Sequence, residues 1–446
     1  MTNIQPEAKP SSVPATKRAK QEGDAPRPPA GAELGVWTER MLRALNRGVK
    51  GNQWFSLIDK VYAEATLEQA WEKVQSNAGG SGVDRITIER FAKGCPRGLL
   101  DLKEQLRTAS YQPLPVKRVW IPKPGTNQHR PLGIPAVRDR IVQTALRLVI
   151  EPIFEHHFAE HSYGFRPGRG CKDALRRVQG LLDEDRTWIV DADLKSYFDT
   201  IPKERLMHRI EERLGDGRVL ALIRSYLDQE VMEELTRHEP TDRGTPQGAV
   251  ISPLLANIYL DPLDHDLAAS GAEMVRYADD FVILCRSEKE AQAALARVQI
   301  WVEENGLTLH PEKTRIVDMS QPGGFDFLGY HFERGYRWPR RKAMDRFKDK
   351  VRALTPRTSG ESLEVTITRL NQRLRGWFGY FQHSHGTTFT QVDGYVRGRL
   401  RSLLRKRAGK KGRARGSDHQ RWRNHYFTEL GLFSLRQAHA SASQSP

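Results

Sequence analysis

Residues 274–285 read Met-Val-Arg-Tyr-Ala-Asp-Asp-Phe-Val-Ile-Leu-Cys, and the rest of the chain is organised around this stretch. Apolar residues flank a short polar centre, which predicts two strands joined at a tip that carries Asp279 and Asp280. Adjacent carboxylates repel each other, and a divalent cation is the usual means of relieving that repulsion. Asp is also a favoured turn residue, so the dipeptide alone fits a solvated turn better than a metal site. The choice depends on the remaining motifs.

A second pair of carboxylates lies in residues 188–194, Trp-Ile-Val-Asp-Ala-Asp-Leu, which we expect to form a strand. Because side chains alternate along a strand, Asp191 and Asp193 point to the same face. Strand geometry alone therefore leaves both as candidate partners of the hairpin. We interpret the nearby Asp199 as a local capping or turn residue.

The charge of the chain is large and unevenly distributed. The 446 residues, enough for two to four domains, carry a formal net charge of +16. Residues 340–436 contain 24 Lys and Arg against 7 Asp and Glu, which is a net charge of +17. Within them, residues 401–415 hold eight cations and no acid. The C-terminal quarter is thus expected to bind a polyanion, most simply a nucleic acid.

The three cysteines stand far apart and lack a Cys-x-x-Cys spacing, which argues against a disulfide framework or a zinc site. We expect a reducing, cytoplasmic setting. The chain has no run that approaches the roughly 18 apolar residues of a membrane span. Residues 1–33 are rich in Pro, Ala and charge, which predicts a disordered N-terminal tail.

Two segments upstream of the carboxylate strands combine cations with features suited to a nucleic acid. Residues 118–125 and 130–135 predict a hairpin, whose cations could hold phosphates or could be solvated. Those cations are Lys117, Arg118, Lys123 and Arg130. The loop at residues 162–170, Ser-Tyr-Gly-Phe-Arg-Pro-Gly-Arg-Gly, can bring backbone and aromatic rings close to a nucleic-acid strand.

The order of these motifs resembles that of the reverse transcriptases, and more narrowly the combined reverse transcriptase and maturase encoded within bacterial group II introns. The order is a strand ending at Asp193, then Phe198, then Thr-Pro-Gln-Gly at 245–248, then the Tyr-Ala-Asp-Asp hairpin. Further matching segments are 81–84, 121–123, 130–135, 163–167, 327–330 and 374–377. The resemblance runs from about Leu57 to the C-terminus. A single such motif is unspecific, whereas the ordered set is specific.

The resemblance implies an α+β fold, a right-hand polymerase whose palm is an antiparallel sheet backed by helices. Fingers and palm would occupy residues 34–335, a helical thumb or maturase region 336–400, and a small basic DNA- and RNA-binding region 401–446. Nothing after Leu435 resembles the Cys pairs and His-Asn-His pattern of the endonuclease domain that some relatives carry. We therefore expect the short form that lacks this domain.

The implied reaction is RNA-directed DNA synthesis, a nucleotidyl transfer in which two Mg²⁺ ions act on a dNTP substrate. The catalytic carboxylates would be Asp193, Asp279 and Asp280, and the spacing to Phe198 selects Asp193 over Asp191. The metal ligands expected from the resemblance are Asp193, Leu194, Asp279 and Asp280.

The resemblance also assigns contacts to the incoming nucleotide. Phe198 would lie under the sugar and leave no room for a ribose 2′-hydroxyl. Lys123 and Arg130 would hold the triphosphate as charge-assisted donors. Gln247 would contact the nucleotide, and Lys313 would help to neutralise the pyrophosphate.

The implied partners are the parent group II intron RNA, an RNA template and a DNA primer or target. The protein would stabilise the spliced fold of the intron and support its mobility by target-primed reverse transcription. One alternative is an RNA-binding splicing maturase without polymerase activity, against which the three carboxylates argue. Another is a different prokaryotic reverse transcriptase, retron-like or diversity-generating, against which Leu-Arg-Gly-Trp at 374–377 and the basic C-terminal region argue.

Overall fold

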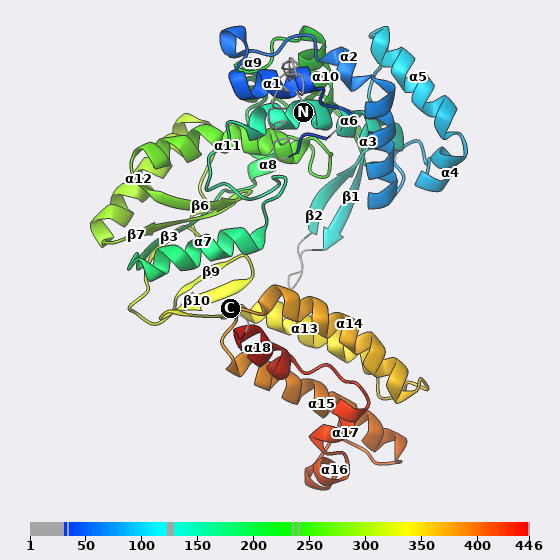
Figure 1. Ribbon diagram of the computed structural model, residues 1–446, viewed down its shortest axis with the longest axis vertical. Coiled ribbons are helices and arrows are strands. Elements are labelled where there is room, and N and C mark those ends of the chain that lie inside the picture. Colours follow the sequence, from blue (N-terminus) through cyan, green and yellow to red (C-terminus); the bar gives the residue numbers. More distant parts are fainter. Residues whose placement is uncertain (1–30, 34, 123–128, 234–235, 240, 445–446) are drawn as a thin grey trace, which may run out of the picture.

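The computed structural model describes residues 31–33, 35–122, 129–233, 236–239 and 241–444. A body that contains the strands lies above a part built only of helices (Figure 1). Helices are combined with mainly antiparallel sheets, which confirms the predicted α+β class. The predicted disordered tail, apart from its last residues, falls outside the described residues. No helix within the described ranges is long and apolar enough to cross a bilayer.

The N-terminal helices pack around α6 (Val137–Glu155), which is buried along most of its length. A helix that is apolar on nearly all sides has to be enclosed by other elements. Trp37 anchors the start of the chain on it, because its indole Nε1 donates to the Leu148 carbonyl at 3.1 Å. The enclosing elements are α1 (Glu39–Arg47), the 3₁₀ turn η1 (Lys50–Asn52), α2 (Ile58–Val61), α3 (Glu64–Asn77), α4 (Ile88–Lys93) and α5 (Cys95–Arg107).

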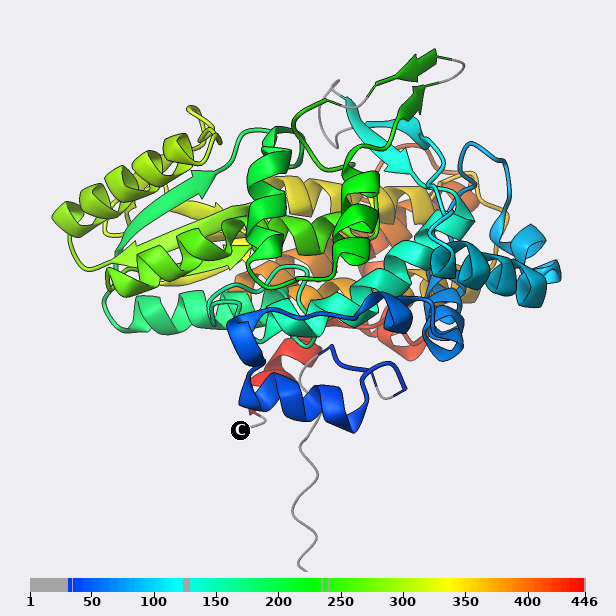
Figure 2. The ribbon, with the colours of Figure 1, turned by 90° about the horizontal axis from the view of Figure 1, so that it is seen from above.

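A four-stranded sheet in the order β2–β1–β4–β5 stands at the rim of this body (Figure 2). Its strands are β1 (Val116–Pro122), β2 (His129–Ile134), β4 (Val231–Glu233) and β5 (Thr236–His238). The antiparallel pairing of β1 with β2 confirms the predicted hairpin. Strand β4 adds to β1 in parallel and returns as β5, an extension that the sequence did not reveal.

The central sheet has the order β6–β7–β3–β8 and is antiparallel throughout. Its strands are β3 (Trp188–Asp193), β6 (Glu273–Tyr277), β7 (Asp280–Cys285) and β8 (Arg315–Asp318). The strand expected at 188–194 and the hairpin expected at 274–285 are thus both confirmed. Figure 1 shows helices on both sides of this sheet.

Alternation along the strands gives the sheet two apolar faces. Ala192 and Ile283 belong to the face that packs against α11 (Ser252–Ala269) and α12 (Glu288–Glu304). Ile189 and Leu284 belong to the opposite face, which packs against α7 (Cys171–Asp183). Three shorter helices connect the layers: α8 (Tyr197–Thr200), α9 (Lys203–Glu211) and α10 (Gly217–Leu227).

A small sheet joins the central sheet to the helical part. It has the order β11–β10–β9, with β9 (Phe325–Phe327), β10 (Tyr330–Glu333) and β11 (Tyr336–Pro339). Its rings pack closely, since Phe325 and Phe332 stack at 5.0 Å between centroids. The Tyr330 hydroxyl donates to the Tyr380 carbonyl at 2.7 Å, which ties this sheet to the end of helix α14 (Leu363–Phe381) in the part below.

The helical part consists of α13 (Arg341–Leu354), α14 (Leu363–Phe381), α15 (Thr387–Arg407), α16 (Gly416–Arg421), α17 (Asn424–Glu429) and α18 (Leu435–Gln444). The core-facing side of α14 follows the helical period, with Leu363, Ile367, Leu370 and Leu374 buried. Helix α15 continues through residue 400, where the expected thumb and basic region meet. One core therefore serves both regions.

Several cations of residues 401–415 have structural partners. Arg401 is buried and donates to the Trp422 carbonyl at 2.8 Å. Arg405 is ion-paired to Asp418 at 2.7 Å. Arg407 donates to the Glu361 carbonyl. The eight cations are therefore not uniformly solvated, because three of the arginines among them make contacts within the fold.

Candidate active site

Three carboxylates meet at one end of the central sheet. Asp193 is the last residue of β3, Asp280 is the first of β7, and the two stand opposite each other in the antiparallel register. Asp279 occupies the hairpin tip next to Asp280. Asp191 lies two residues before Asp193 and so faces the same side of the sheet. The structure thus brings the three predicted catalytic residues together, with Asp191 as a neighbour.

The hairpin tip is tight because Tyr277 pairs directly with Asp280, leaving only Ala278 and Asp279 as the loop. Ala278 has φ +61°, a left-handed conformation that two-residue hairpin loops commonly require. Gly164 presses against this loop: a Cβ there would lie 2.2 Å from the Ala278 nitrogen. Only glycine fits at that position. The Gly-rich loop at 162–170 therefore supports the carboxylates from behind.

A buried polar network holds the tip from below. The Arg276 Nη1 donates to the Ala278 carbonyl at 2.9 Å and to Asn257 Oδ1 at 3.0 Å. Its Nε donates to Asp264 at 2.7 Å, and the two side chains are essentially inaccessible to solvent. Asn257 in turn donates to the Gly164 carbonyl at 2.8 Å. Helix α11 thus connects to both chain segments that shape the tip.

Sequence reasoning did not find this support. Arginine is rarely fully buried, so no buried structural role was predicted for Arg276. A signal was nevertheless present in α11, where Asn257 and Asp264 interrupt an apolar helix. They are seven residues apart, so they lie on one face of the helix and indicate a shared buried partner.

Negative charge accumulates at the site. The pKa of Asp280 is raised to about 7, mainly by burial and then by the charges of the three neighbouring aspartates. Burial is also the main cause that raises the pKa of Asp279, followed by the charge of Asp193. Burial raises the pKa of Asp191 to about 6, although Arg315 lies 3.4 Å from its carboxylate. The ammonium of Lys313 pairs with the carboxylate of Asp193.

The donor chemistry of these residues fits Mg²⁺, which prefers carboxylate oxygens, and a cation would relieve the repulsion that raises these pKa values. Leu194 is buried at the end of β3 and could contribute only its backbone carbonyl. In the described part of the chain, no three His, Cys, Asp or Glu side chains are grouped as a ready metal cage. Lys313 instead supplies the positive charge next to Asp193.

The predicted nucleotide contacts come from separate segments of the chain. The ring of Phe198, in α8, is edge-on to Phe165 at 6.4 Å, so the 162–170 loop and α8 share an aromatic surface. Arg130 is exposed on β2, opposite Ile121. Lys123 lies outside the described residues.

The local interpretation of Asp199 is wrong. Its side chain caps no helix and instead accepts hydrogen bonds from Gln247 Nε2 at 3.1 and 3.0 Å, a contact between segments 48 residues apart. The Gln247 carbonyl also accepts from the Gly133 nitrogen at 2.6 Å. Gln247 therefore links α8 to the β1–β2 hairpin, which no local pattern could reveal.

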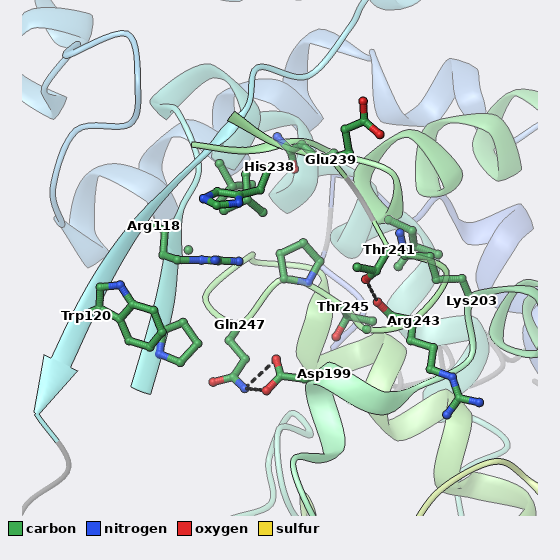
Figure 3. A pocket seen from close by; sticks show the side chains of 18 residues that line it. Arg118, Trp120, Asp199, Lys203, His238, Glu239, Thr241, Arg243, Thr245 and Gln247 are labelled. Carbon is green, nitrogen blue, oxygen red and sulfur yellow. Dashed lines mark hydrogen bonds between the residues drawn. The ribbon is translucent and has the colours of Figure 1, made fainter. Parts of the chain in front are cut away.

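Asp199 and Gln247 form one edge of an open cavity of about 310 Å³ between β1, β4 and the 241–247 loop (Figure 3). Arg118 reaches across it and pairs with Glu233 at 3.3 Å. Lys203 is paired with Asp228 at 3.2 Å. These two cations are thus neutralised by carboxylates that do not line the cavity, and the cavity marks the junction of the hairpin with α8.

Comparison with known proteins agrees with this geometry. Residues 121–332 match the family described as reverse transcriptase (RNA-dependent DNA polymerase). Residues 344–422 match the maturase-specific domain of group II introns. The first match contains all the carboxylates of the site, and the second covers most of the helical part.

Individual proteins match part of the chain. Protein YkfC of Escherichia coli is 36% identical over 292 residues, which cover 57% of this chain and 76% of YkfC. The group II intron-encoded protein LtrA of Lactococcus lactis is 30% identical over 328 residues, which cover 58% of this chain and 54% of LtrA. The chain therefore spans about half the length of LtrA. A chain of a partial Cas6-RT-Cas1–Cas2 complex is 27% identical, with 56% of this chain and 41% of that chain covered and a TM-score of 0.37.

Proposed function

The chain belongs to the family of group II intron-encoded reverse transcriptases with a maturase domain, and we propose that it copies RNA into DNA at the site formed by Asp193, Asp279 and Asp280. It would also bind its parent intron RNA, assist splicing, and support intron mobility by target-primed reverse transcription. These reactions place it in the cytoplasm, and at the nucleoid when its target is DNA.

The register of β3 with β7 is the observation that carries the proposal. It sets Asp193 directly opposite Asp280, with Asp279 at the adjoining tip, so three carboxylates converge on one end of the sheet. These residues would hold two Mg²⁺ ions, which when bound would activate the primer 3′-hydroxyl and stabilise the leaving pyrophosphate. The chain itself supplies the fixed position of the ligands, through the Arg276 network beneath them.

The neighbouring residues have roles that follow from their places. Phe198 would close the space beneath the sugar, with the Phe165 ring against it. Arg130, together with Lys123, would hold the triphosphate from the β1–β2 hairpin. Gln247 would contact the nucleotide while its Nε2 stays bonded to Asp199. Lys313 would leave Asp193 when Mg²⁺ binds and would then be free to neutralise pyrophosphate.

We also propose the functional regions expected above: fingers and palm at 34–335, thumb at 336–400 and a basic binding region at 401–446. The net charge of +17 over residues 340–436 supports nucleic-acid binding by the last two. Because α15 crosses residue 400 and a single core lies beneath, the thumb and basic region would move together.

Two measurements on the purified full chain test this proposal. DNA synthesis from a DNA primer on an RNA template should require Mg²⁺ and stop with EDTA. Sequencing of RNA that copurifies with the protein should recover a group II intron, and added protein should accelerate splicing of that intron. Intron binding and splicing without any DNA synthesis would replace the polymerase proposal with a splicing maturase.

A further inference from the structure

A second cavity, of about 410 Å³, lies in the helical part between α13 and α15. In Figure 1 these two helices lie in the helical part, below the central sheet that carries the carboxylates. The segment leading into α16 closes its lower side through Arg413, Ala414 and His419. The cavity therefore belongs to the region that matches the maturase domain, and the polymerase site makes no use of it.

The lining of this cavity is strongly basic. No Asp or Glu is among the described residues that line it. The ionisable groups that face it from α13, the loop after α13, α15 and residues 413–419 are Lys348, Arg352, Arg357, Arg399, Arg413 and His419. Five of them are permanent cations. Such a concentration of like charge is unfavourable unless an anion is bound between them.

Few of these cations are neutralised. Arg352 is paired with Asp349, and both side chains are more than half exposed. Arg399 donates to the Thr355 carbonyl at 2.7 Å, a neutral partner. Within the described residues, Arg357 and Arg413 form neither an ion pair nor a hydrogen bond with another side chain or carbonyl. Burial lowers the pKa of Arg399, and the charges of its arginine neighbours lower it further.

The shape of the cavity leaves room for a small anionic group. Gly398 forms part of its wall, and a Cβ built there meets no atom within 4 Å. Tyr395 forms the adjacent wall, where its hydroxyl donates to the Lys348 carbonyl at 3.2 Å. The Lys348 ammonium lies 5.9 Å from the centre of that ring, so it is held at the cavity rather than extended into solvent.

We propose that this cavity binds a backbone phosphate of a nucleic acid that lies along the helical part. A phosphodiester carries one negative charge and several acceptor oxygens, which suits convergent guanidinium donors. The inference rests on the proposed function, because it assumes that the maturase region holds a nucleic acid. It adds a discrete phosphate site, distinct from the diffuse attraction of a basic surface.

Binding of the full-length protein to two labelled probes tests this site: an RNA hairpin, and a DNA hairpin of the same sequence. The test variants are Arg357→Gln with Arg413→Gln, which removes two charges from the cavity, and Gly398→Glu, which fills it with a carboxylate. Matched controls are Arg346→Gln with Lys350→Gln on the exposed side of α13, and Thr390→Glu at an exposed position of α15. Thermal unfolding establishes that all variants are folded.

Both cavity variants should weaken binding to the RNA hairpin, the DNA hairpin or both by at least about tenfold, and the controls by less than about threefold. Loss for one probe alone identifies which nucleic acid reaches the cavity. Equal losses in cavity and control variants, or none in either, would overturn the discrete site. Wild-type protein that binds neither hairpin and extends no primer would instead refute the proposed function.

Discussion

The guanidinium of Arg276 and the carboxylate of Asp264 form an ion pair that is sealed from solvent beneath the tip carrying Asp279 and Asp280. The same guanidinium donates to the Ala278 carbonyl, so the pair connects α11 to the loop between the strands. The positions of the carboxylates consequently depend on the packing of a buried helix. An exposed two-residue turn alone would not hold them.

Asp264→Asn should destabilise the protein by about 3–5 kcal/mol, because it leaves the Arg276 charge buried without its counter-ion. Primer extension should fall with it, since the tip loses its support. The matched control is Asp266→Asn in the same helix, which breaks an ion pair with Arg297 whose side chains are 47% and 33% exposed. That change should cost about 0–1 kcal/mol. Thermal unfolding measures the stability of both variants, and primer extension measures their activity. Equal losses of stability and activity in Asp264→Asn and Asp266→Asn would contradict a special role for the buried pair.

Local patterns predicted the strands, because apolar residues on both sides of 279–280 and before Asp193 leave little alternative. The grouping of Asp193 with Asp279 and Asp280 came only from the family resemblance, and the register that puts Asp193 opposite Asp280 was not predicted, since pairing between residues 87 apart leaves no local signal. The Asp199–Gln247 contact was missed for the same reason. Arg276 was missed because a charge in a strand usually indicates exposure. Polar contacts between residues far apart in the chain could thus not be predicted from local sequence patterns.

Phe198→Ala should admit ribonucleotides, because its ring, which lies against Phe165, is proposed to close the space below the sugar. The ratio of kcat/KM for dNTP over rNTP should fall at least about tenfold, which corresponds to roughly 1.4 kcal/mol of transition-state discrimination. Steady-state kinetics with both nucleotides measure it. A ratio equal to that of wild type would remove Phe198 from the nucleotide site.

Asp139 should make stability depend on pH. Its buried carboxylate accepts from Tyr111 at 2.6 Å and from the Leu114 nitrogen at 3.0 Å, yet burial raises its pKa to about 6. Between about pH 4 and 6 the folded protein holds a proton that the unfolded chain releases, so rising pH removes stability in this window.

Asp139→Asn does not titrate there. The free energy of unfolding of wild type minus that of the variant should therefore fall by roughly 2 kcal/mol from pH 4 to pH 7. Unfolding of both proteins across this range measures the difference. A difference that stays constant, or grows with pH, would show that Asp139 ionises normally in the folded state.

The exposed lysines of the basic region should contribute to affinity for long nucleic acids. Replacing Lys406, Lys410 and Lys411 by Ala should weaken binding and lower the salt slope by roughly 0.7–0.9 for each phosphate that the protein no longer neutralises. Extension on a short, saturating primer–template should change little, because the carboxylates remain in place. Arg405→Ala is a contrasting variant: it removes the partner of Asp418 and should lower stability. Superimposable salt titrations of the triple variant and wild type would mean that these lysines are only solvated.

Primer extension on an RNA template by Asp279→Asn, measured beside RNA binding, tests the central claim most directly. The matched control is Asp191→Asn, on the same face of the sheet but paired with Arg315. Asp279→Asn should reduce extension at least about a hundredfold while RNA affinity stays unchanged, and the control should stay within about tenfold of wild type. Extension by Asp279→Asn within about tenfold of wild type would contradict the assignment of the hairpin carboxylates as the polymerase site.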